Sequence, residues 1–128
     1  MSDSLRTVRL ESFDRALSRL ESALAQPKTE WTRDSSIQRF EFTFELAWKT
    51  LAWLVRGQGL EARSPRESLK QAFALGWIDD EDRWLRMLDD RNRASHTYDE
   101  ALAEDLYGRL ASHARDLRQL HGRLTVTD

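Results

Sequence analysis

The chain has 128 residues, enough for one domain with a single hydrophobic core. Hydrophobic residues make up 40% and charged residues 33% of it, a composition typical of folded proteins rather than disordered ones. A net charge of −2 argues against a protein that coats nucleic acid without specificity, although it allows a local basic site. The chain has no cysteine, which excludes disulfides, cysteine zinc sites and thiol catalysis.

The start of the chain mixes charged and apolar side chains, unlike a signal peptide. No apolar run approaches the ~20 residues that cross a bilayer. We therefore expect a cytoplasmic chain that does not contact a membrane. The sequence also lacks a glycine-rich phosphate loop, so we do not expect it to bind ATP as conventional nucleotidyltransferases or kinases do.

The first half of the chain has the periodicity of two long helices. Apolar residues recur at spacings of three and four over residues 10–24, which predicts an amphipathic helix that ends before Pro27. A second helix is predicted over residues 35–56, with Thr32 or Asp34 as its cap. It has two apolar stripes, so it should lie at the centre of a bundle or be shared with a partner chain. The first stripe contains Ile37, Phe40, Phe44, Ala47, Trp48, Leu51 and Val55, and the second contains Phe42, Leu46 and Trp53.

The second half begins with a strong helix start. Residues 64–67, Ser-Pro-Arg-Glu, suit the N-cap, the first helical position and the capping box of a short helix that ends at Gly76. A fourth helix should open at the two aspartates of residues 79–80, whose charge suits a helix N-terminus, and continue through residues 91–96. Its apolar face is formed by Trp84, Leu85, Met87 and Leu88.

A last helix is predicted from about Asp99 to Leu120, followed by a loose tail after about Gly122. No stretch has the alternation and turn signals of a strand. Residues 1–128 are therefore predicted to form one domain. Its fold class is all-α, an antiparallel up-and-down helical bundle of about five helices.

The end of the fourth helix changes from apolar to polar at Arg91, Asn92 and His96. Asn92 and His96 share a helix face that begins as apolar core. Such a cluster suits RNA cleavage without a metal, because histidine moves protons near neutral pH and arginine holds phosphate. Asn92 could orient the imidazole or the phosphate. The alternative is a capping or packing cluster, because His and Arg favour the negative end of a helix.

We expect the other polar residues to have structural roles. His113 and His121 are expected to face solvent, and no metal is assigned to them. Asp89 and Asp90 are expected to form surface salt bridges with arginines. The acidic and basic residues at 41, 45 and 49 form a helix-stabilising charge row, the alternative being that Glu41 or Glu45 touches the polar cluster. The tryptophans are expected in the core or in dimer contacts: Trp31, Trp48, Trp53, Trp77 and Trp84.

Three segments have a distinctive pattern: residues 37–49 (IQRFEFTFELAWK), 64–67 (SPRE) and 87–92 (MLDDRN). Together they resemble a prokaryotic HEPN subfamily whose members are often labelled nucleotidyltransferase substrate-binding protein. Arg91 and His96 match the arginine-x4-histidine motif of HEPN proteins, and Tyr98 extends it to the histidine-x-tyrosine form. The resemblance spans about residues 5–120.

The resemblance implies a helical bundle that forms a symmetric homodimer. In active HEPN proteins the arginine and histidine of both protomers meet in a cleft and cut RNA without a metal or cofactor. It therefore implies catalytic roles for Arg91, Asn92 and His96. Many such chains are encoded beside a minimal nucleotidyltransferase (MNT) antitoxin, which transfers AMP to the motif tyrosine, here Tyr98.

The leading hypothesis is thus a toxin ribonuclease of a HEPN/MNT toxin–antitoxin pair. Its expected partners are a second copy, the MNT antitoxin and RNA, with no DNA and no membrane. The alternative is a non-catalytic subunit that binds substrate or nucleotide for a nucleotidyltransferase. A dimeric scaffold without a ligand is a third possibility.

Overall fold

The structure is a computed structural model that describes residues 2–126. Over this range it contains five α-helices, a short 3₁₀ helix and no strand. The predicted all-α bundle of about five helices is confirmed. The elements in chain order are α1 (Ser2–Ala25), α2 (Glu30–Gly57), α3 (Pro65–Ala74), α4 (Glu81–Arg93), η1 (Ala94–His96) and α5 (Glu100–Val126).

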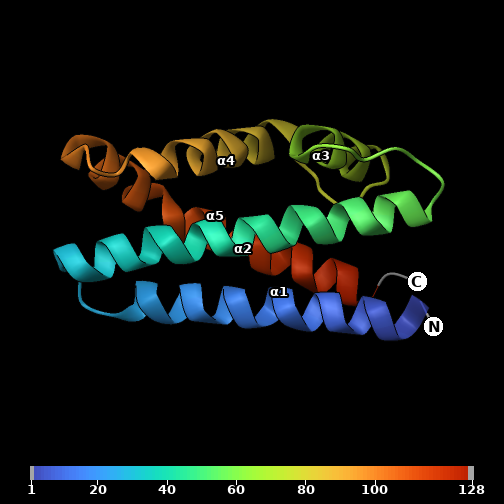
Figure 1. The fold of residues 1–128 in the computed structure, drawn as a ribbon, viewed down its shortest axis with the longest axis horizontal. Coiled ribbons are helices and arrows are strands. Elements are labelled where there is room, and N and C mark those ends of the chain that lie inside the picture. The colour runs from blue at the N-terminus through green and yellow to red at the C-terminus, as the bar shows by residue number, and fades with distance from the viewer. Residues whose placement is uncertain (1, 127–128) are drawn as a thin grey trace.

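Helix α2 is the centre of the bundle, because every other α-helix packs against it. In Figure 1, α3 and α4 follow one another along one side of α2 while α1 lies along its other side. The termini lie at one end of the molecule, and the turn from α4 into α5 lies at the opposite end. This arrangement leaves the α4–α5 turn exposed at the end of a long, rigid bundle.

The predicted start of α2 was wrong. Its N-cap is Thr29, whose side chain accepts a hydrogen bond of 3.0 Å from the backbone N–H of Thr32. The Thr32 hydroxyl accepts one of 2.7 Å from the backbone N–H of Thr29 in return. Two threonines thus form the capping box that a serine or threonine with glutamate usually forms, so the usual sequence pattern does not predict it.

The helix start predicted at residues 64–67 is confirmed. Ser64 caps α3 by accepting a hydrogen bond of 3.1 Å from the backbone N–H of Glu67, and Pro65 occupies the first turn. The Glu67 carboxylate accepts from the backbone N–H of Arg63, at 2.6 Å, rather than from that of Ser64. The return bond of the capping box therefore reaches one residue further than predicted.

The loose tail predicted after Gly122 was also wrong up to Val126. Helix α5 continues to that residue, and Leu124 is fully buried. The reason is that the leucine spacing of α5 persists past Gly122, so Leu124 still points into the core. The core side chains that are fully buried include Phe13, Leu17, Phe40, Phe44, Leu51, Leu69, Met87, Leu106, Leu110 and Leu117.

The two apolar stripes of α2 have different environments. The first stripe is buried except for the half-buried Trp48, whereas in the second Phe42 is 50% exposed and Leu46 and Trp53 are half-buried. Of the tryptophans, Trp84 belongs to the core and Trp31 is exposed. The second stripe therefore finds only partial cover within one chain. Among the described helices, none is long and apolar enough to cross a membrane.

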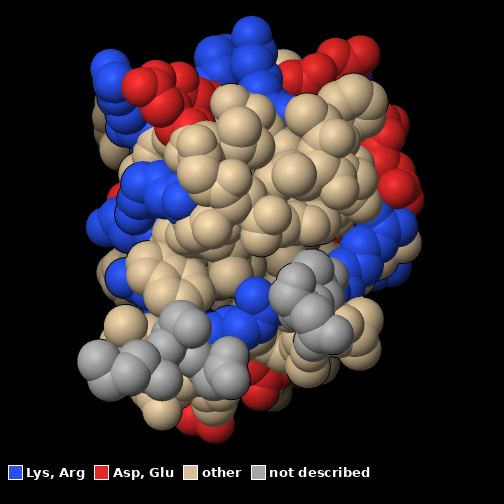
Figure 2. All heavy atoms as spheres, turned by 90° about the vertical axis from the view of Figure 1, so that its right-hand side faces the viewer, with Lys and Arg blue, Asp and Glu red and all other residues tan. Residues whose placement is uncertain are grey.

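The end of the molecule that carries the termini has a broad uncharged surface bordered by charged side chains, as Figure 2 shows. This surface lies at the opposite end from the turn between α4 and α5. It is therefore separate from the candidate site.

Candidate active site

The polar cluster predicted at residues 91–96 lies where α4 ends and the chain turns towards α5. Helix α4 ends at Arg93, and the next three residues form η1 instead of continuing the α-helix as predicted. The chain must reverse here, and Asp99 caps α5 by accepting a hydrogen bond of 3.2 Å from the backbone N–H of Leu102. The motif is thus divided between a helix end and an exposed turn.

Arg91 points from α4 towards α2. Its guanidinium donates to the carboxylate of Glu45 and, at 3.2 Å, to the side-chain oxygen of Asn92. Glu45 also pairs with Lys49 at 3.4 Å, so the predicted charge row exists. However, the alternative reading of that row is also correct, because Glu45 contacts the motif arginine.

The pKa values of the two carboxylates of α2 near Arg91 shift in opposite directions. Burial would raise the pKa of Glu45, but the polar and charged groups around it, Arg91 among them, outweigh burial and lower the pKa. Burial raises the pKa of Glu41, which the charge of Arg91 offsets only in part. Arg91 is therefore anchored by an ionised Glu45. A guanidinium has five N–H donors, so this anchoring leaves donors free for a phosphate.

His96 and Tyr98 form the second part of the site. Their ring centroids are 6.0 Å apart with an edge-on geometry, and both side chains are exposed. Within the described residues, no hydrogen bond or ring contact joins this pair to Arg91 and Asn92. A single chain thus brings the site residues together as two adjacent pairs, one held against α2 and one open to solvent.

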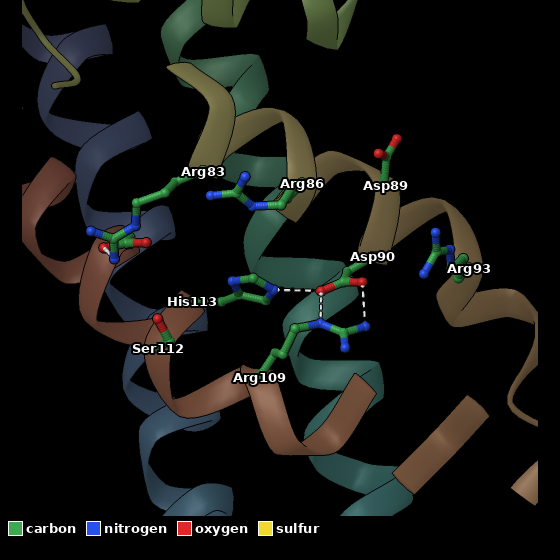
Figure 3. A pocket seen from close by; sticks show the side chains of 9 residues that line it. Arg83, Arg86, Asp89, Asp90, Arg93, Arg109, Ser112 and His113 are labelled. Carbon is green, nitrogen blue, oxygen red and sulfur yellow. Dashed lines mark hydrogen bonds and ion pairs between the residues drawn. The ribbon is translucent and has the colours of Figure 1, made fainter. Parts of the chain in front are cut away.

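The most strongly paired group near the motif is one that sequence reasoning missed. Asp90, predicted to be at the surface, is 3% exposed and lies between α4 and α5 (Figure 3). Its carboxylate accepts bonds of 2.8 and 2.7 Å from the Arg109 guanidinium and lies 2.7 Å from Nε2 of His113. His113 also stacks on Phe40 with ring centroids 5.3 Å apart. Asp90 therefore joins α4 to α5.

The predictions for both histidines were wrong. His113 is buried, and His121 is half-buried with Nε2 3.0 Å from the carbonyl oxygen of Leu10. A signal for His113 was present in the sequence, because it continues the apolar spacing of Leu106, Leu110 and Leu117. A histidine at such a position is buried, and burial requires a polar partner. Over the described residues, no group of three or more His, Asp or Glu side chains could hold a metal ion.

We expect Asp90 to contribute to stability in a pH-dependent way. Burial alone would raise its pKa, but hydrogen bonds from His113 and Arg109 lower the pKa to about 2. The carboxyl of an unfolded chain titrates near ~3.9. The ionised form therefore stabilises the fold above that pH by about 2 kcal/mol, and this contribution is lost as the pH falls towards 2.

The substitution Asp90→Asn should lower the free energy of unfolding by about 3 kcal/mol near neutral pH, because it leaves Arg109 without its buried partner. The difference from the wild type should narrow as the pH falls from ~4 towards ~2. Urea denaturation followed by circular dichroism at several pH values measures both effects. The matched control is Asp89→Asn, since Asp89 is exposed and forms no ion pair within the described residues. Equal effects of the two substitutions would contradict the role of Asp90.

Comparison with known proteins places these features in a family. The family model described as "Nucleotidyltransferase substrate binding protein like" matches residues 8–126. The probable ribonuclease HepT of Haemophilus influenzae is 31% identical over 80 residues, which cover 59% of this chain and 55% of that protein. The match thus spans about half the length of this curated relative.

Solved structures share the fold over nearly the whole chain. A protein from Thermus thermophilus has a TM-score of 0.83 and 38% identity, covering 88% of this chain and 98% of that one. A tri-AMPylated HEPN toxin from Shewanella oneidensis, in complex with an MNT antitoxin, has a TM-score of 0.78 and covers 95% of this chain and 97% of that one. At 18% identity the latter likeness is one of fold. Because the family model covers almost all of its residues, the chain belongs to the nucleotidyltransferase substrate-binding-like family of HEPN proteins.

Proposed function

We propose that this chain is a metal-independent endoribonuclease, the toxin of a HEPN/MNT toxin–antitoxin pair. The observation that carries the proposal is the exposed turn after α4, where His96 follows an arginine that is anchored in place. Family membership and the likeness to a probable ribonuclease support it. Arg91 and His96 are the proposed catalytic residues, and Asn92, which accepts from Arg91, completes the site.

The proposed reaction uses the 2′-hydroxyl of the RNA as its nucleophile. His96 takes the proton of that hydroxyl as the bond from O2′ to phosphorus forms. The bond from phosphorus to O5′ then breaks, and the leaving oxygen receives a proton from the second imidazole of a dimer. Arg91 donates to the phosphoryl oxygens, where negative charge builds up. The products are a 2′,3′-cyclic phosphate and a 5′-hydroxyl, so the step consumes no water. DNA, which lacks the 2′-hydroxyl, is not a substrate.

A homodimer is part of this proposal. Two observations support it: the second apolar stripe of α2 is only partly covered, and one chain supplies a single exposed imidazole in the motif. In this stripe the side chain of Phe42 is 50% exposed, although aromatic side chains are usually well buried. A second copy that covered this stripe would bury it. Pairing would also bring a second copy of the motif to the molecule.

The substitution His96→Ala should slow RNA cleavage by about 10²–10⁴-fold, because it removes the proton-transfer group. Folding should be unaffected, since His96 is exposed and, within residues 2–126, its only ring contact is with Tyr98. Cleavage of a labelled RNA in the presence of EDTA measures the rate, and thermal unfolding checks the fold. Ser95→Ala, in the same exposed turn, is the matched control and should keep the wild-type rate. Equal rates for wild type and His96→Ala would refute the assignment.

We further propose that the MNT partner silences the toxin by transferring AMP to Tyr98. The side chain is 84% exposed and its ring lies 6.0 Å from that of His96. A negatively charged nucleotide on Tyr98 would repel the RNA phosphate and obstruct the turn. The modified state of the toxin from Shewanella oneidensis is a precedent for the chemistry in a protein of this fold.

Co-expression of the chain with an MNT protein should increase its mass by one or more AMP units, and peptide mass spectrometry should locate AMP on Tyr98. Tyr98→Phe should lose that adduct. Tyr107, a residue of α5, is the matched internal control. It is half-buried with Lys28 over its ring and should stay unmodified. The proposal would be contradicted if Tyr98 stayed unmodified while the co-expressed MNT protein silenced the toxin.

The description of the family favours a second candidate function, a non-catalytic subunit that binds substrate or nucleotide for a nucleotidyltransferase. It would use the same exposed turn. Calorimetry with a mononucleotide and the transferase, beside the RNA assay, separates the two. Tight nucleotide binding by a chain that leaves every RNA intact would favour this second function.

A further inference from the structure

A pocket of about 340 Å³ lies between α4 and α5. Its walls are rich in arginine and aspartate, together with Ser112 and His113. Figure 3 shows Arg109 and His113 of α5 bound to Asp90 of α4. The residues that line it are Arg83, Arg86, Asp89, Asp90, Arg93, Arg109, Ser112, His113 and Asp116.

The acidic groups of this pocket are already neutralised or turned aside. Asp90 is bound by Arg109 and His113, and Asp116 forms an ion pair of 2.6 Å with Arg83. The carboxylate of Asp89 points away from this cluster in Figure 3. Asp89 is thus the one lining aspartate without an ion pair within the described residues, and the charges of Asp90 and Asp116 are compensated.

Two arginines of the pocket remain available to a ligand. Arg86 and Arg93 are exposed, and neither forms a hydrogen bond or ion pair within the described part of the chain. They lie two turns apart on one face of α4, and in Figure 3 both guanidinium groups reach over the pocket. Ser112 adds a hydroxyl from α5. Two unpaired guanidinium groups that face one cavity suit a phosphate, which accepts several hydrogen bonds from arginine forks.

We propose that the α4–α5 pocket binds a backbone phosphate of single-stranded RNA next to the nucleotide that is cut. Arg93 lines the pocket and is the last residue of α4 before η1, so the pocket adjoins the proposed catalytic turn. A strand that crosses the end of α4 can therefore meet Arg91 with one phosphate and the pocket, through Arg86 and Arg93, with another. This inference rests on the proposed ribonuclease function and adds a positioning site to it. It also explains how a chain with a net charge of −2 can hold RNA.

The test uses binding rather than cleavage, so that it does not depend on catalysis. In the His96→Ala chain, fluorescence anisotropy with a fluorescein-labelled oligouridylate measures the RNA affinity at several salt concentrations. Adding Arg86→Ala and Arg93→Ala should weaken binding about tenfold, and lower the salt slope by about 0.7 for one lost phosphate contact on a single strand. The matched control replaces Arg66 and Arg115, which are exposed, form no ion pair with any residue that the structure describes, and lie outside the pocket.

The control double variant carries the same change in net charge and should bind RNA as the parent does. Equal weakening by the two double variants would overturn the inference, since general electrostatics would then account for the loss. Binding of inorganic phosphate, followed by ³¹P NMR and lost in Arg86→Ala/Arg93→Ala without a change in RNA affinity, would assign the pocket to a free phosphate and also overturn it. A wild-type chain that binds RNA through this pocket but cuts none would contradict the ribonuclease proposal alone.

Discussion

The rest of the site depends on the buried carboxylate of Asp90. It receives a bidentate contact from Arg109 and a contact from His113, and these fix the rotation of α4 against α5. Successive residues of a helix point about 100° apart. With Asp90 facing α5, Arg91 must face α2, where Glu45 binds it. One buried interaction thus decides where the motif arginine points, and breaking such a pair costs about 3–5 kcal/mol.

The same constraint explains why one part of the site is held in place and the other is exposed. Arg91 is anchored on the rigid side and can meet a phosphate with little loss of side-chain freedom. His96, the last residue of η1, and Tyr98 after it are exposed and reachable by RNA or by a modifying enzyme. The face of α4 that turns to α5 carries the arginines of the pocket beside Asp90. A short helix held from two sides therefore presents three different surfaces.

Sequence alone predicted the helices whose apolar spacing is regular, the Ser64 cap and the family, because these depend on local pattern. It missed the Thr29 cap, since a pair of threonines is an uncommon form of the capping box. It also missed the burial of His113 and Asp90, which pair with each other across α4 and α5, and it left the contact of Glu45 with the motif as one of two alternatives. Periodicity shows which face of a helix is buried, but the partner of a buried polar group depends on how two helices are rotated against each other. The sequence could place the motif residues in one segment but could not show that they form two pairs.

We propose that this turn cuts RNA by using the 2′-hydroxyl as the nucleophile, without a metal. The most direct test is a single-turnover reaction in EDTA with an end-labelled RNA and with the same strand carrying one 2′-deoxynucleotide at the position of cleavage. We expect the RNA to be cut to a 2′,3′-cyclic phosphate, and we expect the substituted strand to stay intact at that position. Cleavage of the substituted strand at that position, or an RNA that is cut only when a divalent metal is restored, would contradict it.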